Sequence, residues 1–302
     1  MNTLTSSYLL RLSVVGLAVS LVFGAAGCQS GQMRNSMISP SQENDEGREY
    51  ASEIDSQVKF VMDGKINRHL LDVVTPVLAQ AQKDRPDVSF RVRIIDSPEL
   101  NAFSIPGGYI YIYRGLLDKI GTDDDALACV IGHEAAHVVR RHVVKEQSDS
   151  ENKGLLVDIA TVLSRSYQVN QVGGALFELD QLHYSRVAEF EADRWGERFA
   201  YNAGYDPCGM IRTFQLFEAE EKKSGQEAPY AQDHPINENR ILRVEEQLRE
   251  LRANHGQYIE ENYSDKDDQV AAAKNGIDYP ALVLSTKMPT PASVMAAGSP
   301  KP

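Results

Sequence analysis

Residues 123–147 read DDDALACVIGHEAAHVVRRHVVKEQ, and this stretch organises the rest of the chain. Aspartates at its start supply an N-cap and first-turn negative charge, and basic side chains gather near its end, so we predict one helix to about Gln147. It contains His133-Glu134-Ala135-Ala136-His137. With about 3.6 residues per helical turn, His133 and His137 share a face. Two imidazoles on one face can bind a zinc ion, and Glu134 between them can act as general base.

A zinc site with two histidines needs a third protein ligand and leaves a fourth position for water. The best candidate lies in the sequence EFEAD at 189–193, on a helix predicted over about 183–203. Glu189 and Asp193 share a face because they are four positions apart. We expect Glu189 to bind the metal and Asp193 to accept a hydrogen bond from a ligating histidine. Glu191 is the rival for the ligand role. The alternative to a metal site is that these acidic residues form a solvated face of the helix.

These two motifs are similar to those of the gluzincin zinc metallopeptidases of the HtpX, BepA, LoiP and yeast CAAX-protease group. Two further segments resemble the same family: Asn101–Gly108, and His234-Pro235 followed by Arg240. The likeness covers about residues 50–250. It implies an α+β fold, mainly helical and zincin-like, with a small antiparallel sheet beside the H-E-x-x-H helix and one zinc ion per chain.

The resemblance also implies roles for single residues. Glu189 would be the third zinc ligand, and Asp193 would support it. His234 would lie near the metal, either closing the site at rest or stabilising the reaction oxyanion; a turn residue before proline is the alternative. Arg240 could hold a carboxylate or a peptide carbonyl, or form an ordinary surface salt bridge. The histidines outside these motifs are expected to be non-catalytic: His69, His142, His183 and His255.

The predicted activity is that of a metalloendopeptidase. Zinc lowers the pKa of water from about 15.7 toward about 7, Glu134 takes the proton and passes it to the leaving amine, and zinc and His234 stabilise the oxyanion. An extended substrate would add to an exposed strand edge, for which Tyr109-Ile110-Tyr111 is the candidate. The strand over 109–113 could equally be interior to the sheet, in which case its tyrosines belong to the core.

The remaining elements predict a metallopeptidase domain over residues 49–255. Pro76 could kink or divide the first helical pattern. Residues 88–95 alternate as a strand, and a turn-rich loop over 101–108 precedes the second strand. The apolar segment 154–182 is expected to pack in the core or against a membrane surface. Helical patterns occur at about 50–82, 154–182, 208–222 and 236–255.

The N-terminus predicts export and lipid anchoring. Residues 1–27 contain a short apolar run after Arg11, which is typical of a secretory signal. The ending Gly24-Ala25-Ala26-Gly27-Cys28 resembles a bacterial lipoprotein signal, in which Cys28 becomes the lipidated first residue, although Ala25 stands where that pattern usually has Leu. Ordinary cleavage or an uncleaved anchor are the alternatives. By the same resemblance, Gln29 favours the outer membrane. Residues 28–48 predict a flexible tether, and 256–302 an extension that is disordered at its end.

Composition narrows the class of partner. The formal net charge of -12 and the lack of a basic stripe exclude a general nucleic-acid partner. After Cys28, Cys129 and Cys208 remain, and they could form a disulfide or pack as small buried hydrophobes; zinc ligation by Cys129 is a third alternative.

We therefore predict an envelope lipoprotein that faces the periplasm and cleaves misfolded or misassembled envelope proteins. A zinc-retaining chaperone or assembly lipoprotein with a closed site is the first alternative. A purely structural envelope lipoprotein with coincidental motifs is the second. The sequence does not predict the oligomeric state.

Overall fold

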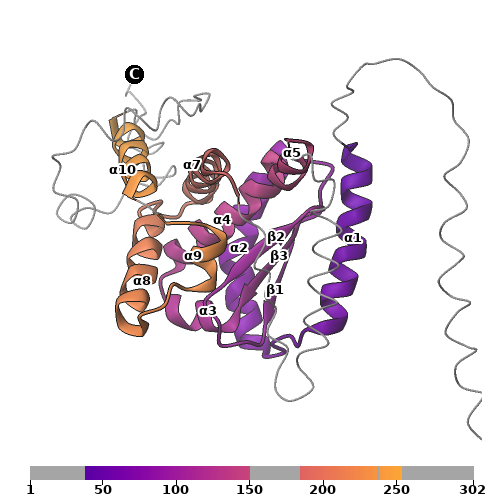
Figure 1. The fold of residues 1–302 in the computed structure, drawn as a ribbon, viewed down its shortest axis with the longest axis horizontal. Coiled ribbons are helices and arrows are strands. Elements are labelled where there is room, and N and C mark those ends of the chain that lie inside the picture. The colour runs from indigo at the N-terminus through magenta and orange to yellow at the C-terminus, as the bar shows by residue number, and fades with distance from the viewer. Residues whose placement is uncertain (1–37, 150–183, 237, 254–302) are drawn as a thin grey trace, which may run out of the picture. The chain divides into compact units, whose positions relative to one another are not determined.

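Helix α4 (Asp124–Arg140), which carries the H-E-x-x-H sequence, is buried from Ala126 to Val139, and most of the other elements pack against it. The computed structural model describes residues 38–149, 184–236 and 238–253. Among these residues helices predominate, with one small sheet (Figure 1), so the predicted α+β class is confirmed. The other elements are α1 (Pro40–Gln57), α2 (Gly64–Asp84), β1 (Arg91–Ile95), β2 (Ala102–Ile105), β3 (Tyr109–Tyr113), α3 (Arg114–Ile120), α5 (His142–Asp149), α7 (Arg186–Asn202), α8 (Gly209–Ser224), α9 (Pro229–Asp233) and α10 (Glu238–Ala253).

The sheet has three strands in the order β1-β3-β2 and is mixed, not wholly antiparallel as expected. Strands β2 and β3 form an antiparallel pair because the turn between them is short and both of its glycines, Gly107 and Gly108, have positive φ. Strand β1 pairs in parallel with β3. The segment 101–108 was expected to be a loop, but it contains strand β2. Strand β3 is central, so the choice of Tyr109-Ile110-Tyr111 as a free substrate edge is wrong, and the interior alternative holds.

The two faces of the sheet pack against different helices. Ile110 and Ile112 of β3 join the core cluster that contains α2 and α4. Tyr111 and Tyr113 point to the opposite face and join the cluster that contains Ile54 of α1. Because side chains alternate along a strand, one short segment of aromatic and β-branched residues thus supports both layers. This arrangement holds the sheet beside α4 (Figure 1).

Helix α1 begins inside the segment 28–48 that was expected to be a flexible tether. Ser39 caps the helix: its side chain accepts from the N–H of Gln42, the Gln42 side chain accepts from the N–H of Ser39, and Pro40 occupies the first turn. At Gly47 a Cβ atom would lie 1.9 Å from the carbonyl oxygen of Pro106, so the helix is packed closely on the β2–β3 turn. The described domain therefore includes residues 40–48 and does not begin at 49.

The long helical pattern over 50–82 is divided, but not at Pro76. Helix α1 ends at Gln57, and α2 begins after Asp63, whose side chain accepts hydrogen bonds from the N–H groups of Lys65 and Ile66. Pro76 lies inside α2. Asp63 marks the start of the second helix more strongly than Pro76 does, because an aspartate side chain accepts hydrogen bonds from N–H groups that the first turn of a helix leaves free.

The helix predicted to run from Asp123 to Gln147 is broken at Arg141. This residue has φ 57°, the left-handed conformation, so α4 ends and α5 takes a new direction. For a residue with a Cβ this conformation costs about 1–2 kcal/mol. Two contacts stabilise it: Nε of Arg141 donates to Oε2 of Glu43 in α1 (2.6 Å), and Nη2 donates to the carbonyl of Ile38, just before α1 (2.5 Å). Glu43 is itself buried and also faces Arg85.

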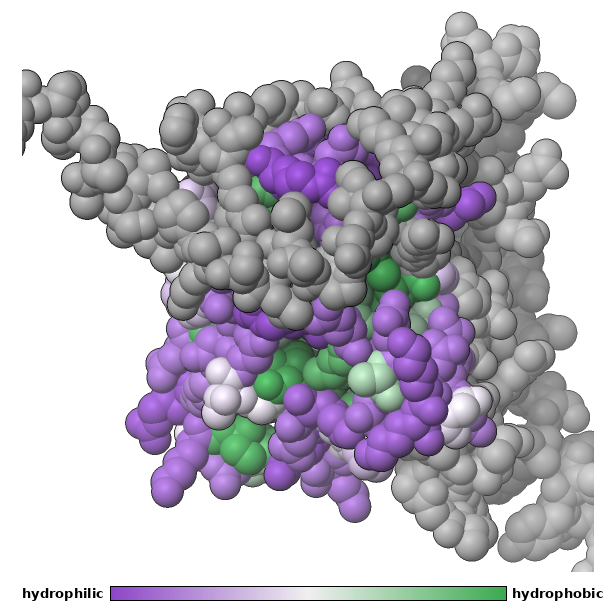
Figure 2. Space-filling model, turned by 90° about the vertical axis from the view of Figure 1, so that its left-hand side faces the viewer, coloured by the Kyte–Doolittle hydropathy of each residue, from purple (hydrophilic) through white to green (hydrophobic). Residues whose placement is uncertain are grey.

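The helices predicted at about 183–203, 208–222 and 236–255 are confirmed as α7, α8 and α10, and Val244, Leu248 and Leu251 form the buried stripe of α10. Cys129 and Cys208 are both buried and form no disulfide, which agrees with the prediction that they pack as small hydrophobic residues. Hydrophilic side chains predominate among the described residues on the side of α8 (Figure 2). In the described part of the chain, no helix is long and apolar enough to cross a bilayer. The predictions for residues 1–37, including Cys28, and for 154–182 and 256–302 fall outside the described residues.

Candidate metal centre

Two glycines bring α4 and α7 into direct backbone contact. A Cβ on Gly132 would lie 2.6 Å from the carbonyl oxygen of Gly196, and a Cβ on Gly196 would lie 2.6 Å from the backbone nitrogen of His133. Real Cβ atoms essentially never come so close, so this crossing requires glycine on both helices. The contact lies next to His133, and it sets the distance across which Glu189 on α7 faces the histidines of α4.

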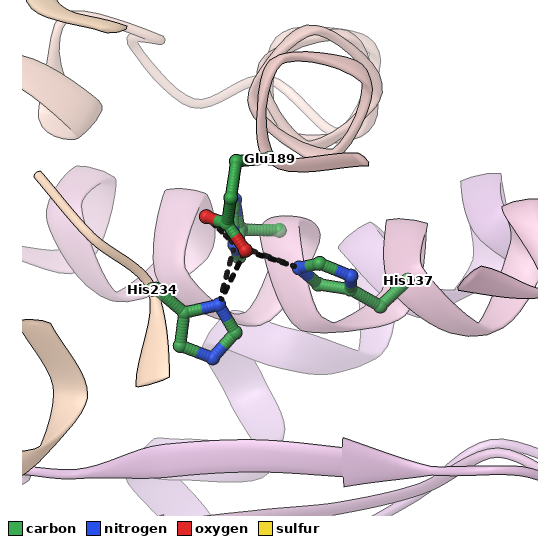
Figure 3. Close-up of side chains that lie close together, drawn as sticks. His137, Glu189 and His234 are labelled. Atoms are coloured by element: carbon green, nitrogen blue, oxygen red, sulfur yellow. Dashed lines mark hydrogen bonds and ion pairs between the residues drawn. The ribbon is translucent and has the colours of Figure 1, made fainter. Parts of the chain in front are cut away.

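The predicted ligands converge as the sequence analysis expected (Figure 3). Nε2 of His133 and Nε2 of His137 lie 3.0 Å apart. The Glu189 carboxylate places Oε2 3.5 Å from Nε2 of His133 and Oε1 3.4 Å from Nε2 of His137. His234, which follows α9, adds a fourth donor: its Nδ1 lies 3.0 Å from Oε1 of Glu189 and 3.3 Å from Nε2 of His133.

This donor set fits a zinc ion. One nitrogen or oxygen from each of the four residues lies within 4.8 Å of all the others, and each of the four is buried. Ligands at about 2.0–2.1 Å from a tetrahedral zinc ion lie roughly 3.3–3.5 Å from one another, which is close to the spacings found here. Neither Glu191 nor Cys129 belongs to this set, so the alternatives that made either one a ligand are wrong.

The formal charges also suit a divalent cation. Glu134, Glu189 and Asp193 carry three carboxylates into a buried region, and Arg240 brings one guanidinium. Buried charges are stable only when they are paired or bound to a metal. Even with His234 protonated, the cluster keeps a net negative charge, which a divalent cation such as Zn²⁺ would offset.

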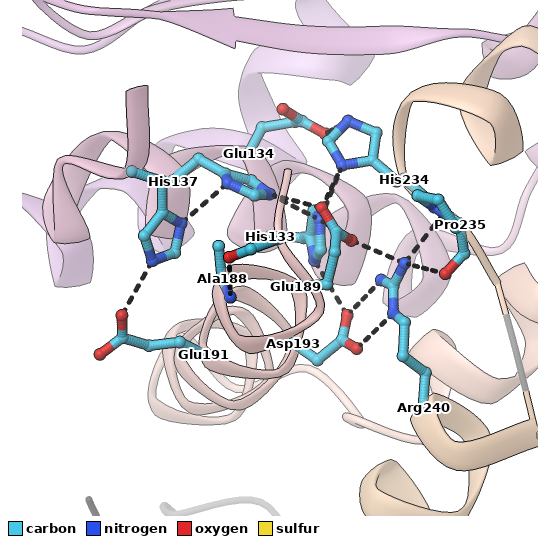
Figure 4. Close-up of polar contacts among 12 residues, drawn as sticks. His133, Glu134, His137, Ala188, Glu189, Glu191, Asp193, His234, Pro235 and Arg240 are labelled. Carbon is cyan, nitrogen blue, oxygen red and sulfur yellow. Dashed lines mark hydrogen bonds and ion pairs between the residues drawn. The ribbon is translucent and has the colours of Figure 1, made fainter. Parts of the chain in front are cut away.

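Asp193 and Arg240 hold the ligands from behind (Figure 4). Oδ1 of Asp193 lies 2.9 Å from Nδ1 of His133. Arg240 donates to both carboxylate oxygens of Asp193, at 2.7 and 2.8 Å, and its Nη1 forms an ion pair with Oε2 of Glu189 at 2.6 Å. Arg240 also donates to the backbone carbonyl of His234 and is only 1% exposed, so the surface salt-bridge alternative is wrong. One arginine thus fixes three parts of the centre.

These contacts set protonation states that a metal ligand needs. Burial lowers the pKa of His137 well below its usual value, which favours the neutral imidazole. Burial alone would raise the pKa of Glu189, but the charge of Arg240 and then that of His234 hold it well below its usual range. Asp193 is anionic for the same reason, since Arg240 outweighs the effect of burial on its pKa. Neutral imidazole and ionised carboxylate are the forms that bind zinc.

His234 faces the donor set on one side and Glu134 on the other. Its Nε2 lies 3.4 Å from Oε1 of Glu134, and its ring stacks on Tyr230 with the centroids 4.6 Å apart. Burial opposes a charge on this imidazole, but the carboxylates of Glu189 and Glu134 raise its pKa to about 9. His234 does end α9 in a turn, yet it is 1% exposed and lies within the donor set, so the turn alternative alone is insufficient.

Glu134 is placed for proton transfer. Both of its carboxylate oxygens are buried and form no hydrogen bond with the described residues, although Nε2 of His234 faces Oε1 at 3.4 Å. A buried carboxylate that accepts no hydrogen bond is unfavourable unless water or a cation completes its environment. Glu134 lies on the turn of α4 between the two histidines, as the motif predicted.

Sequence reasoning missed two residues that touch the centre. Nδ1 of His142 lies 2.9 Å from Nδ1 of His137; the sequence predicted only that His142 is non-catalytic. The ring of Tyr184 stacks on His137 with the centroids 3.8 Å apart. Glu191 does not face the donor set; it lies against His142 and Arg140. No local pattern marks His142, because its position depends on the break at Arg141.

Comparison with known proteins agrees with this centre. The model of peptidase family M48 matches residues 64–248. The mitochondrial metalloendopeptidase OMA1 of Schizosaccharomyces pombe is 31% identical over 168 residues, which are 54% of this chain and 48% of that protein. The Danio rerio metalloendopeptidase OMA1 is 30% identical over 197 residues, 59% of this chain and 40% of that protein. The Escherichia coli beta-barrel assembly-enhancing protease is 22% identical over 231 residues, 74% of this chain and 47% of that protein.

The chain spans about half the length of these relatives or less. The family match, however, covers more than half of the chain and includes every ligand candidate from His133 to His234. The chain therefore belongs to peptidase family M48, a family of zinc metallopeptidases.

Proposed function

We propose that this chain is a zinc-dependent endopeptidase that cleaves misfolded or misassembled proteins of a bacterial cell envelope. One observation carries the proposal: Glu189 of α7 meets His133 and His137 of α4 in a buried cluster, with Glu134 beside it. A zinc ion bound there acts as a Lewis acid and lowers the pKa of water from about 15.7 toward about 7.

The residues of the chain then divide the work. His133, His137 and Glu189 would hold the ion, and Arg240 and Asp193 fix the direction of two of these ligands. The carboxylate of Glu134 takes the proton that the attacking water loses and passes it to the leaving amine. The ring of His234, with a proton on Nε2, can donate to negative charge that develops on the peptide carbonyl oxygen.

The substrate strand must lie elsewhere than on β3. Strand β2 is an edge of the sheet and contacts α4. The N–H of Tyr113 bonds to the carbonyl of Asn101, and in an antiparallel pair such bonds occur at every second residue. The backbone groups of Ser104 therefore point away from β3. An extended peptide that pairs with this edge would run beside the catalytic helix.

A second candidate function is supported by the position of His234. Its Nδ1 belongs to the donor set, and all four side chains of that set are buried. A fourth protein ligand fills the position that a catalytic zinc site leaves for water. In this alternative the chain is a zinc-retaining chaperone or assembly factor with a closed, rarely active site. Replacing His234 with Ala separates the two roles: cleavage rises if His234 closes the site and falls if it stabilises the oxyanion.

The main test is a Glu134→Gln variant assayed for casein cleavage and zinc content. We expect it to bind one zinc ion and to lose cleavage, because the amide keeps the shape of the side chain but cannot take a proton. Glu49→Gln, the same change at an exposed site on α1, is the control and should keep full activity. Cleavage by Glu134→Gln equal to that of the control would remove Glu134 from the mechanism. A wild-type protein without stoichiometric zinc would contradict the whole proposal.

The envelope location rests on the N-terminal sequence and on two relatives. Residues 1–28 predict export and lipidation of Cys28, and with Gln29 they favour the periplasmic face of the outer membrane. Two relatives bear the name beta-barrel assembly-enhancing protease in Escherichia coli and Shigella flexneri. Envelope proteins are therefore the proposed substrates. Metabolic labelling with a palmitate analogue tests the anchor, and a Cys28→Ala variant should lose the label.

A further inference from the structure

The two ligand histidines of α4 are supported in different ways. Nδ1 of His133 faces a carboxylate directly, that of Asp193, at 2.9 Å. Nδ1 of His137 instead faces a second imidazole, with Nδ1 of His142 at 2.9 Å. The other nitrogen of His142 lies 2.8 Å from Oε2 of Glu191. On α7, Glu191 and Asp193 point to different sides of the helix (Figure 4), so that each serves a different histidine.

We propose that His142 is a positioning residue for zinc: it orients His137 and transmits the hydrogen-bonding effect of Glu191 to it. The inference rests on the zinc site proposed above and does not depend on which proteins are cleaved. It makes Glu191, which is no ligand, the end of a carboxylate–imidazole–imidazole chain that leads to the metal.

The proton positions in this chain follow from simple counting. If Nε2 of His137 binds a metal, its only proton is on Nδ1, which must then donate to Nδ1 of His142. A neutral His142 then carries its proton on Nε2 and donates it to Glu191. Both short contacts are satisfied by this single assignment. The far end is fixed as well, because Arg140 forms an ion pair with Glu191 and Nζ of Lys145 lies 3.6 Å from it.

The fold brings these rings together only because α4 is interrupted. In a continuous helix, a residue five positions after His137 would point about 140° away from it. The left-handed conformation of Arg141 turns the chain so that His142 returns to His137. His142 is 2% exposed, and Tyr184 packs on His137. In this buried setting the hydrogen bonds do not compete with water, so they can fix the orientation of the ring.

The test measures zinc affinity by competition with a chromophoric chelator. In His142→Leu we expect the zinc dissociation constant to rise about 10–100-fold, the usual effect of removing a partner of a ligating histidine. In His142→Asn the side-chain oxygen can still accept from His137, so most of the affinity should return. Glu191→Gln should give a smaller loss than His142→Leu. His69→Leu, at an exposed histidine of α2, is the matched control and should bind zinc like the wild type.

Two further readouts separate positioning from a structural role. The melting temperature of the metal-free protein should be similar in His142→Asn and the wild type, and the visible spectrum of the cobalt-substituted protein should change in His142→Leu but not in His69→Leu. The inference is overturned if His142→Leu binds zinc as tightly as the control, or if its weaker binding is not restored by Asn. A wild-type protein that takes up no zinc would overturn the proposed function as well, so the two failures are distinguishable.

Discussion

The contact between Gly132 and Gly196 leads to the sharpest prediction, because it links helix packing to metal binding. In Gly132→Ala the new methyl group would lie 2.6 Å from a backbone oxygen of α7, against 3.4 Å or more in ordinary van der Waals contact. No rotamer can relieve the overlap, since both atoms are fixed to the backbone. The helices must therefore move apart by several tenths of an ångström at the residue before His133.

The magnitude follows from two opposing effects. Alanine is favoured over glycine inside a helix by about 1 kcal/mol. Overpacking in a close-packed interior costs about 1–3 kcal/mol, and the upper part of that range applies where backbone faces backbone. We expect a net loss of roughly 1–2 kcal/mol in the free energy of unfolding of the metal-free protein. Zinc should bind more weakly too, because a ligand set tolerates displacements of only about 0.5 Å.

The assay is chemical denaturation of the metal-free protein together with zinc competition. Gly64→Ala is the matched control, because nothing lies within 4 Å of a Cβ at that helical position. We expect the control to be as stable as the wild type or slightly more stable, with unchanged zinc affinity. The reasoning is refuted if Gly132→Ala matches Gly64→Ala in both stability and zinc affinity.

Three further predictions concern charge and metal. The pKa of Asp123 is lowered because hydrogen bonds from Arg212 and from a first-turn N–H outweigh the effect of burial. The ionised carboxylate therefore stabilises the fold above about pH 4, and this stabilisation is lost as the pH falls through the pKa of the folded state. In Asp123→Asn, which keeps the cap, the stability difference from the wild type should therefore shrink in acid during urea titrations; a constant difference would contradict this. Arg240→Met removes the guanidinium that pairs with the buried carboxylates of Glu189 and Asp193, and it should cost about 3–5 kcal/mol in urea denaturation. Chelation should lower the melting temperature of the wild type and added zinc restore it, with about 2.7 kcal/mol gained when free zinc is about 100 times its dissociation constant.

The sequence predicted most of the metal centre because the information was local. His133 and His137, like Glu189 and Asp193, are four residues apart, and helical periodicity alone places each pair on one face. The structure brings the two faces together within ligand distance. The same periodicity favoured Glu189 over Glu191 as the third ligand. His234 and Arg240 required the family resemblance, because no spacing rule connects them to a site one hundred positions earlier.

The strand order could not be predicted in the same way. The pattern at 109–113 marks a strand, but whether that strand is central or at an edge depends on which segments pair with it. Strand β1 pairs with β3 although β2 lies between them in the sequence, and the alternation of residues along a strand does not show this pairing. The choice of Tyr109-Ile110-Tyr111 as a substrate edge was therefore wrong for a reason that lies outside the strand itself.

The errors at the N-terminus and at the end of α4 have one physical cause. Residues 40–48 are polar and predicted a tether, but Glu43 among them is buried and holds Arg141 nearly one hundred positions later. That contact stabilises a backbone conformation which arginine adopts only at a cost, and the resulting break determines where His142 lies. A local reading of residues 123–147 sees good helix formers throughout and has no reason to stop. The partner of His137 is thus determined by an ion pair between the beginning of the domain and the end of its catalytic helix, and only tertiary structure can place it.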